Sequence, residues 1–372
     1  MKIVSVMTGA APGGAEFAAG ELLGALVDRG HEAVVLSDWA GIGRDTGVRV
    51  GPPLELGPKL SARTWPGLIA RWPLLRRRLQ AALAAEAPYD VLLLHYKKDQ
   101  LLAAGLPAPL RAQTLWAEWG PLPRQMRQGP GRRAYLRAAG TVSHVLAISA
   151  GTRDSLVAAG LPADQVSVVP NALRTDRIRF TAAGREEMRE RLGVGADAFL
   201  VGCTSRFHHA KRNDVLVDAV IRCGPEVELV LAGTGPEEAA LRERAAPLGA
   251  RAHFLSTPSD ADREALFSAF DVNVFCPSPA EGSPTSVILG MLTERASLAT
   301  APEGVAGLID AETGAVAEPE NDPAAVAEML GAYAADPELR RRQGAAGRER
   351  AAATFDRDVV AAQVEAIIAG GA

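Results

Sequence analysis

Short runs of apolar residues alternate with longer amphipathic segments along the whole chain. The apolar runs are predicted to be strands, and an amphipathic segment such as Ala15–Arg29, stopped by Gly30, a helix. The strands predicted in the first half are Lys2–Thr8, Ala33–Ser37, Val91–Leu94, Thr114–Ala117 and Val145–Ile148. A second series comprises FLVGCTS from Phe199, VELVLAG, RAHFLS and DVNVFCP, followed by a helix from about Pro284. This alternation predicts the α/β class, with doubly wound parallel sheets covered by helices on both faces.

The two series of strands predict two domains, in agreement with a length of 372 residues. A polar segment with a helical stretch inside it, Pro170–Gly195, connects them. We therefore expect an N-terminal domain over residues 1–172 and a C-terminal domain over 173–354. A last helix, at about Arg357–Ala369, follows within residues 355–372. Two such domains facing each other bind ligands in the crevice at the carboxyl ends of their strands.

The composition, with 48% hydrophobic and 23% charged residues, excludes a disordered or collagen-like chain. No run reaches the roughly 18 uncharged apolar residues that a membrane-spanning helix needs. The first residues resemble a short signal peptide, but Glu16 and a glycine pair interrupt them, which favours a buried strand. Cys203, Cys223 and Cys276 have no spacing for a disulfide framework or a zinc site and fit a reducing compartment. We therefore expect a cytoplasmic, soluble protein.

The net charge of −4 hides an asymmetry between the two halves. Residues 1–180 carry 22 Lys/Arg and 14 Asp/Glu residues, and the remainder carries 18 and 30. The arginines cluster at Arg76–Arg78 and at Arg124, Arg127, Arg132, Arg133 and Arg137. They form either solvated helix faces or a surface for an anionic acceptor or an anionic membrane leaflet. A nucleic-acid partner is not expected, because aromatic residues make up only 5% of the chain and no stacking platform accompanies the arginines.

A helix rich in Trp, Leu and Arg is predicted over Trp65–Ala85, broken by Pro73. Together with the basic first half, it suits a lipid-linked or anionic glycan acceptor and peripheral contact with the inner membrane face. A small-molecule or natural-product acceptor remains an open alternative.

Glycines follow the first predicted strand, at Gly13 and Gly14. They either form a tight turn or let the backbone approach an anionic ligand at the start of the next helix. The segment does not match the GxGxxG pattern, so no dinucleotide fingerprint is supported.

Two cations, Arg206 and Lys211, lie between a predicted strand and a helix in TSRFHHAKRND. Such a pair can clamp a diphosphate, with Arg as a planar fork and Lys as a point charge; the alternative is two surface cations. His208 and His209 lack a third ligand nearby, and no metal site is expected.

The segment from Pro279 to Thr300 predicts a helix whose N-terminus can bind phosphate oxygens. Ser283 suits the N-cap and Pro284 the first helical position. Glu281 lies just outside, where its carboxylate can accept hydrogen bonds from sugar hydroxyls or, alternatively, cap the helix.

These motifs resemble those of the retaining glycosyltransferases of family 4, which have the two-domain GT-B architecture. The resemblance covers most of the chain and is strongest over about Leu146–Gly314. It rests on TSRFHHAK for the diphosphate clamp, on LAGTGPE for a Gly-x-Gly turn, on EGSPTSVIL for the glutamate element and on GGAE for the first-domain loop. Ala147–Asn171 and the last helix are also similar to family elements, and the latter implies a helix that packs back onto the N-terminal domain.

The resemblance implies a role for each matching residue. Arg206 and Lys211 would bind the donor pyrophosphate, and Glu281 the hydroxyls of the donor sugar. The remaining implied donor contacts are Gly13, Gly14, Gly233, Gly235, Phe254, Gly282, Ser283, Pro284 and Thr285. The co-substrate would be a nucleoside-diphosphate sugar, most simply a UDP- or GDP-sugar, with no metal ion and no other cofactor.

The chain departs from the family at two places. Leu289 stands where the family has a second glutamate for the ribose, and two unpaired ribose hydroxyls cost about 1–3 kcal/mol; Gly290 stands where the family usually has Ala. In the first domain, Glu118 stands near the position of a family histidine. Glu118 is therefore either a base for the acceptor hydroxyl or a structural residue, and His95 is the second candidate.

Three functions follow from this pattern. The first is transfer of a sugar, with retention of configuration, to an acceptor hydroxyl. The second is a weakened, glycosyltransferase-like binding or partner subunit, and the third a sugar-nucleotide epimerase or phosphorylase of the same fold.

Overall fold

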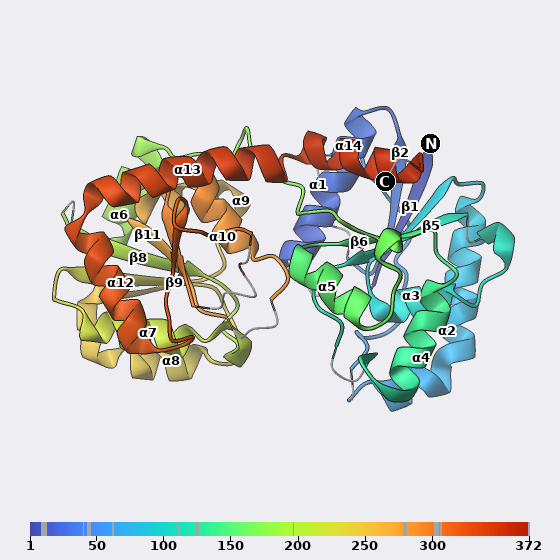
Figure 1. Ribbon diagram of the computed structural model, residues 1–372, viewed down its shortest axis with the longest axis horizontal. Helices are drawn as coiled ribbons and strands as arrows, with labels where there is room; N and C mark the ends of the chain where they lie inside the picture. The colour runs from blue at the N-terminus through green and yellow to red at the C-terminus, as the bar shows by residue number, and fades with distance from the viewer. Residues whose placement is uncertain are drawn as a thin grey trace. The chain divides into compact units, whose positions relative to one another are not determined.

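Figure 1 shows the computed structural model, which describes residues 1–8, 13–39, 41–42, 46–61, 63–110, 112–123, 126–195, 197–277, 281–300, 305 and 307–370. Gly9–Pro12 of the first turn, Arg124 of the basic cluster and Pro279 lie outside these residues. The chain divides into unit 1, Met1–Leu173 with Phe355–Ala372, and unit 2, Arg174–Thr354. The boundary expected from the sequence lies one residue earlier, after residue 172.

Unit 1 contains a seven-stranded parallel sheet in the order β3-β2-β1-β4-β5-β6-β7. Its strands are β1 (Lys2–Met7), β2 (Glu32–Ser37), β3 (Arg49–Val50), β4 (Val91–Leu94), β5 (Gln113–Glu118), β6 (His144–Ala147) and β7 (Val166–Val168). Its helices are α1 (Gly14–Asp28), α2 (Trp65–Glu86), α3 (Lys97–Ala103), α4 (Gly129–Ala139), α5 (Ala150–Ala158) and α14 (Arg357–Ile368). Separate apolar clusters cover the two faces of the sheet, so its strands are buried on both sides.

The last helix, α14, packs against α1 within unit 1 (Figure 1). Glu365 of α14 accepts hydrogen bonds from Arg29 at 2.6 Å and from His31 at 2.7 Å. Val360 and Val364 are buried in the same apolar cluster as Leu22 and Leu26 of α1. The final helix therefore completes the core of unit 1, although more than 180 residues of unit 2 precede it.

Unit 2 contains a six-stranded parallel sheet in the order β10-β9-β8-β11-β12-β13. Its strands are β8 (Phe199–Thr204), β9 (Val227–Ala232), β10 (Ala252–Leu255), β11 (Val272–Phe275), β12 (Ala296–Ala299) and β13 (Gly314–Val316). Its helices are α6 (Ala182–Leu192), α7 (Asn213–Arg222), α8 (Glu238–Arg244), α9 (Asp260–Ala269), α10 (Thr285–Leu292), α12 (Pro323–Ala335) and α13 (Pro337–Phe355). Helix α6 packs with α9, whereas α7 packs with α8 and α12.

The predicted α/β class with parallel sheets is confirmed, and the predicted strands lie within a residue or two of the observed ones. The apolar pattern did not predict the strands β3, β7, β12 and β13. The predicted break of the second helix at Pro73 is wrong, because α2 continues through it as one helix. Proline removes one backbone hydrogen bond, but the buried stripe of Leu68, Leu75, Leu79 and Leu83 continues on both sides of it and holds the two halves together.

Candidate functional site

The order of strands in unit 2 reverses between the neighbouring strands β8 and β11. Such a switch point opens a binding position at the carboxyl ends of parallel strands. Arg206 and Lys211 follow β8, and Glu281 follows β11. The fold therefore brings together three residues that the sequence separates by up to 75 positions.

Lys211 and Glu281 form an ion pair at this position. The Lys211 Nζ lies 2.6 Å from the Glu281 Oε1, and the two side chains are 16% and 23% exposed. The ammonium group also lies 5.2 Å from the centre of the Phe275 ring at the end of β11. A partly buried cation at this distance is held by both the carboxylate and the ring face.

Arg206 lies on the same loop as Lys211 but is exposed. Its guanidinium makes no hydrogen bond or ion pair with the described part of the chain. His208 lies between the two cations, and burial, together with the neighbouring His209, lowers its pKa. Within the described residues, Arg206 therefore has no ion-pair partner, whereas Lys211 is paired with Glu281.

Two glycines let the turn after β9 pack against the loop after β8. A Cβ on Gly233 would lie 1.9 Å from the carbonyl oxygen of Ser205, and one on Gly235 would lie 2.2 Å from that of Phe207. Backbone hydrogen bonds join the same segments, including one of 2.9 Å from Phe207 to Thr234. Gly233 and Gly235 thus fix the loop that carries Arg206, a role that the sequence did not reveal.

Phe254 of β10 packs edge-to-face against Phe207, with ring centres 6.3 Å apart. The Arg242 guanidinium lies 4.4 Å from the centre of the Phe254 ring. Phe254 is therefore near the loop after β8, as a residue lining a base site would be, but one side of its ring contacts Arg242.

Helix α10 starts one residue later than predicted. Pro284, with extended φ and ψ of −73° and 106°, is the N-cap, and Thr285 is the first helical residue. The predicted N-cap, Ser283, is one position too early, because the fixed φ of proline also suits the residue that enters a helix. Glu281 and Gly282 precede this turn directly, so the free amides at the start of α10 lie close in sequence to the Lys211–Glu281 pair.

Leu289 is 6% exposed and belongs to an apolar cluster that includes Phe267 and Phe270. Gly290 is explained by its neighbour on β11: a Cβ on Gly290 would lie 2.6 Å from the Asn273 Nδ2. Asn273 fills that space and donates a hydrogen bond of 3.2 Å to the carbonyl of Ser286. Leu289 and Gly290, which depart from the family pattern, are therefore both parts of the packing around α10.

In unit 1, Gly13 is the N-cap of α1 and Gly14 its first residue. Gly13 has an extended φ of −162°, which any residue can adopt. Glu16, in the first turn, accepts a hydrogen bond from the Tyr96 hydroxyl, and Lys59 Nζ lies 3.8 Å from the same carboxylate.

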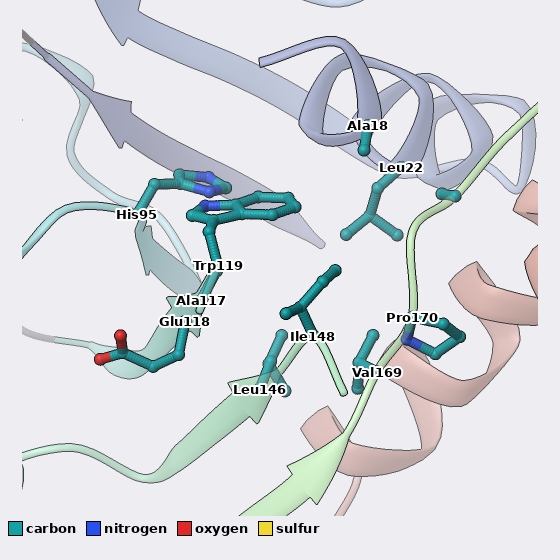
Figure 2. A pocket seen from close by; sticks show the side chains of 11 residues that line it. Ala18, Leu22, His95, Ala117, Glu118, Trp119, Leu146, Ile148, Val169 and Pro170 are labelled. Carbon is teal, nitrogen blue, oxygen red and sulfur yellow. The ribbon is translucent and has the colours of Figure 1, made fainter. Parts of the chain in front are cut away.

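Glu118 ends β5 and is 4% exposed. Both of its carboxylate oxygens have partners: Lys97 donates to one, and the Tyr135 hydroxyl to the other at 2.9 Å. Burial lowers the pKa of Lys97, although the Glu118 charge opposes that shift. Figure 2 shows the carboxylate directed away from Trp119 and Ile148, which favours the structural interpretation of Glu118.

His95 follows β4 and is 3% exposed. Its Nε2 lies 2.8 Å from the Ser5 Oγ, and its ring stacks on Trp119 with centres 5.7 Å apart (Figure 2). Among the described residues its Nδ1 has no hydrogen-bond partner, and burial lowers the pKa of His95 to about 3. A base with so low a pKa takes up a proton poorly at neutral pH.

Sequence reasoning missed the partners that hold these side chains. Lys97 and Tyr135 lie 21 and 17 residues from Glu118 in the chain, and Ser5 lies 90 residues from His95. The lysine pair in LLLHYKKD, which includes Lys97, was the one feature of the sequence that could have indicated a charged partner for Glu118.

Over the described residues, no group of three His, Cys, Asp or Glu side chains is placed to hold a metal ion. The three cysteines are free thiols, and burial raises the pKa of Cys203 to about 11. No helix in the described ranges is long and apolar enough to cross a membrane.

Comparison with known proteins identifies both units. Residues 12–177 match Glycosyltransferase Family 4, and residues 198–336 match Glycosyl transferases group 1. The chain is 30% identical, over 233 residues, to the GDP-mannose-dependent alpha-(1-6)-phosphatidylinositol monomannoside mannosyltransferase of Mycolicibacterium smegmatis. It is 31% identical, over 257 residues, to the Mycobacterium tuberculosis protein of the same name. These matches take in 59% and 65% of this chain, and 60% and 66% of the relatives' own lengths.

The fold is similar to that of Anabaena Alr3699/HepE, solved in complex with UDP and glucose, with a TM-score of 0.82 and 21% identity over 100% of both chains. It is also similar to WaaG, a glycosyltransferase involved in lipopolysaccharide biosynthesis, with a TM-score of 0.74 and 18% identity over 100% of both chains. These likenesses show the fold, and the matches to both units show the family. The chain therefore belongs to the GT-B-fold glycosyltransferases of family 4, also called group 1.

Proposed function

We propose that this protein transfers a sugar from a nucleoside-diphosphate sugar to an acceptor hydroxyl, with retention of configuration. The observation that carries the proposal is the Lys211–Glu281 ion pair of 2.6 Å at the switch point of the unit 2 sheet. A cation and a carboxylate side by side match a donor with an anionic diphosphate next to a sugar bearing hydroxyls. A UDP- or GDP-sugar fits this description, since relatives act with GDP-mannose and a protein of the same fold binds UDP.

Catalysis would depend on electrostatic stabilisation of the leaving group. Departure of the nucleoside diphosphate leaves negative charge on its phosphates, and Arg206, Lys211 and the amides at the start of α10 can neutralise it. We propose that no metal ion is required, because these groups supply the positive charge themselves. Glu281 would orient the donor sugar through its hydroxyls.

The acceptor is a lipid-linked or anionic glycan, or a small molecule. The membrane alternative draws support from α2, where Trp65, Ile69 and Leu74 are 42%, 48% and 48% exposed beside the exposed Arg71 and Arg77. Apolar side chains among arginines suit an anionic lipid surface. Sedimentation with anionic and with neutral liposomes at low salt tests this contact, and pelleting independent of anionic lipid would contradict it.

A second candidate function rests on Leu289. Because this side chain is packed among apolar residues, it offers no acceptor for ribose hydroxyls. That arrangement favours a binding or partner subunit with a weakened donor site. An epimerase, the third reading, would convert the donor alone without any acceptor.

Thermal shifts with UDP, GDP, ADP, dTDP and their common sugar conjugates distinguish these functions. A ligand at 100 times its dissociation constant adds about 2.7 kcal/mol to stability. We expect a shift with UDP or GDP that is lost in Lys211→Ala and retained in Arg342→Ala, a distant exposed cation. The absence of a shift with every nucleotide would favour the partner subunit.

A further inference from the structure

The edge of the unit 2 sheet opposite the Lys211–Glu281 pair contains a cavity. Strands β11 and β12 begin directly after Asp271 and Arg295, whereas Glu281 follows the carboxyl end of β11. Because the strands are parallel, their amino ends share one edge. A cavity of about 270 Å³ is found at this edge, between α6, the first turns of α13 and the two segments that enter β11 and β12. One water molecule needs only about 10–15 Å³, so a larger ligand fits.

The side chains that line this cavity carry an excess of positive charge. Four are arginines and two are acidic: Arg185, Arg295, Arg340, Arg341, Asp271 and Glu294. The charge of Asp271 is already shared, since Arg185 lies 2.7 Å and Arg189 3.3 Å from its carboxylate. Among the described residues, neither Arg295 nor Arg340 forms an ion pair with a carboxylate.

Both of these guanidinium groups are held in place by carbonyl oxygens and aromatic rings. Arg295 donates to the carbonyls of Thr293 at 2.9 Å and Phe270 at 3.1 Å and lies 4.6 Å from the centre of the Phe180 ring. Arg340 donates to the Ala334 carbonyl at 3.3 Å and lies 5.1 Å from the Phe199 ring centre. Carbonyls and rings orient the charge without neutralising it.

Burial, followed by the charge of Arg185, lowers the pKa of Arg295 to about 10. Several guanidinium groups held together repel one another, and an anion between them would remove that repulsion. Because the groups are already oriented, binding would cost little side-chain ordering.

We propose that this cavity, which we call the Arg295 pocket, binds the phosphate group of a small phosphorylated metabolite. The planar fork of arginine matches two phosphate oxygens, and a phosphate monoester carries close to two negative charges at neutral pH. The volume exceeds what a bare phosphate ion needs and leaves room for a carbon skeleton. The pocket lies at the opposite edge from the donor site, so this proposal does not depend on the proposed function.

Calorimetric titration with glucose 6-phosphate, inorganic phosphate and glucose tests the proposal. All three probes are titrated into the wild-type protein and into Lys211→Ala, whose donor-side cation is removed. We expect saturable binding of glucose 6-phosphate in both proteins, weaker binding of inorganic phosphate, and none of glucose.

A matched pair of variants on α13 locates the binding. Arg341 lines the pocket, whereas Arg342, the next residue, does not. Arg341→Glu should weaken glucose 6-phosphate binding at least about tenfold, and Arg342→Glu should change it less than about twofold. The Arg341 side chain is 73% exposed and pairs with the 66% exposed Glu338, so its loss should not unfold the protein. Arg341→Gln provides a second variant without charge reversal.

Three results would overturn the proposal. The first is the absence of saturable glucose 6-phosphate binding to the wild-type protein. The second is an equal loss of affinity in the Arg341 and Arg342 variants, and the third is a loss of binding in Lys211→Ala alone. Equal affinity for inorganic phosphate and glucose 6-phosphate would overturn the assignment to a phosphate ester.

Discussion

Lys211 and Glu281 lie 70 residues apart in the chain, yet the Lys211 ammonium donates to the Glu281 carboxylate at 2.6 Å. The pair joins the loop after β8 to the segment before α10, on the two strands where the sheet order reverses. The ion pair fixes both side chains, so that Lys211 could contact the diphosphate of a donor and Glu281 its sugar.

Replacing Lys211 with Ala is expected to lower turnover at least about a hundredfold, because the departing diphosphate loses a fixed positive charge. Steady-state release of nucleoside diphosphate measures the effect, with Arg342→Ala as the control. In a double-mutant cycle with Glu281→Gln, we expect the two losses to be clearly non-additive, since the residues are in contact. A Lys211→Ala enzyme with near-normal turnover would refute the proposed donor site.

Leu289→Glu is expected to destabilise the protein by about 2 kcal/mol or more at pH 8, because a carboxylate would be buried in the cluster with Phe267 and Phe270. Burial would raise the pKa of the new carboxyl above its unfolded value. The penalty should therefore be smaller at pH 5 and grow as the pH rises. Urea unfolding at both pH values checks this, with Leu289→Met as the control. Unchanged stability with tighter nucleotide binding would mean that position 289 faces the donor.

Gly290→Ala is expected to cost about 1–3 kcal/mol of stability, because the new Cβ would overlap Asn273. Adding Asn273→Ala should recover part of that loss, since it empties the space that the methyl group needs. Denaturant unfolding of the two single variants and the double variant measures the coupling. Simple additivity of the two losses would contradict the overlap.

His95 should make stability depend on pH. Burial lowers its pKa from 6.5 to about 3, so the unfolded chain takes up a proton that the folded state does not. Stability from this group is complete above pH 6.5 and falls as the pH decreases towards 3, by at most about 1.4 kcal/mol per pH unit.

The Asp99 carboxyl acts in the opposite direction, because burial raises its pKa from 3.8 to about 6 and stability falls as the pH rises between these values. The comparison of wild type with His95→Gln isolates the histidine. Between pH 7 and pH 5 the wild type should lose about 1–2 kcal/mol more than the variant in urea unfolding. Parallel pH profiles for the two proteins would show that His95 is protonated in the folded state.

Chelation should leave transfer unaffected. With Arg206, Lys211 and the α10 amides supplying positive charge, activity after extensive dialysis against EDTA is expected to stay within about twofold of the starting rate. Loss of activity that added Mg²⁺ or Mn²⁺ restores would require a metal in the mechanism.

The alternating apolar pattern by itself determined the strands and the α/β class, because buried parallel strands are read directly as short apolar runs. Local motifs also marked Arg206, Lys211 and Glu281, since each follows a strand. What the sequence could not give was the pairing of side chains from distant strands. Lys211 meets Glu281 only because β8 and β11 are neighbours in the sheet.

Packing decided the remaining questions. From the sequence, Gly290 is only a departure from the family pattern; in the structure, Asn273 occupies the space that a side chain at this position would need. From the sequence, Glu118 is a candidate base; in the structure, Lys97 and Tyr135 donate hydrogen bonds to its two carboxylate oxygens. The periodicity of apolar residues predicts which residues are buried. The hydrogen-bond partner of each buried polar group depends instead on how strands and helices are arranged, and that arrangement exists only in the folded chain.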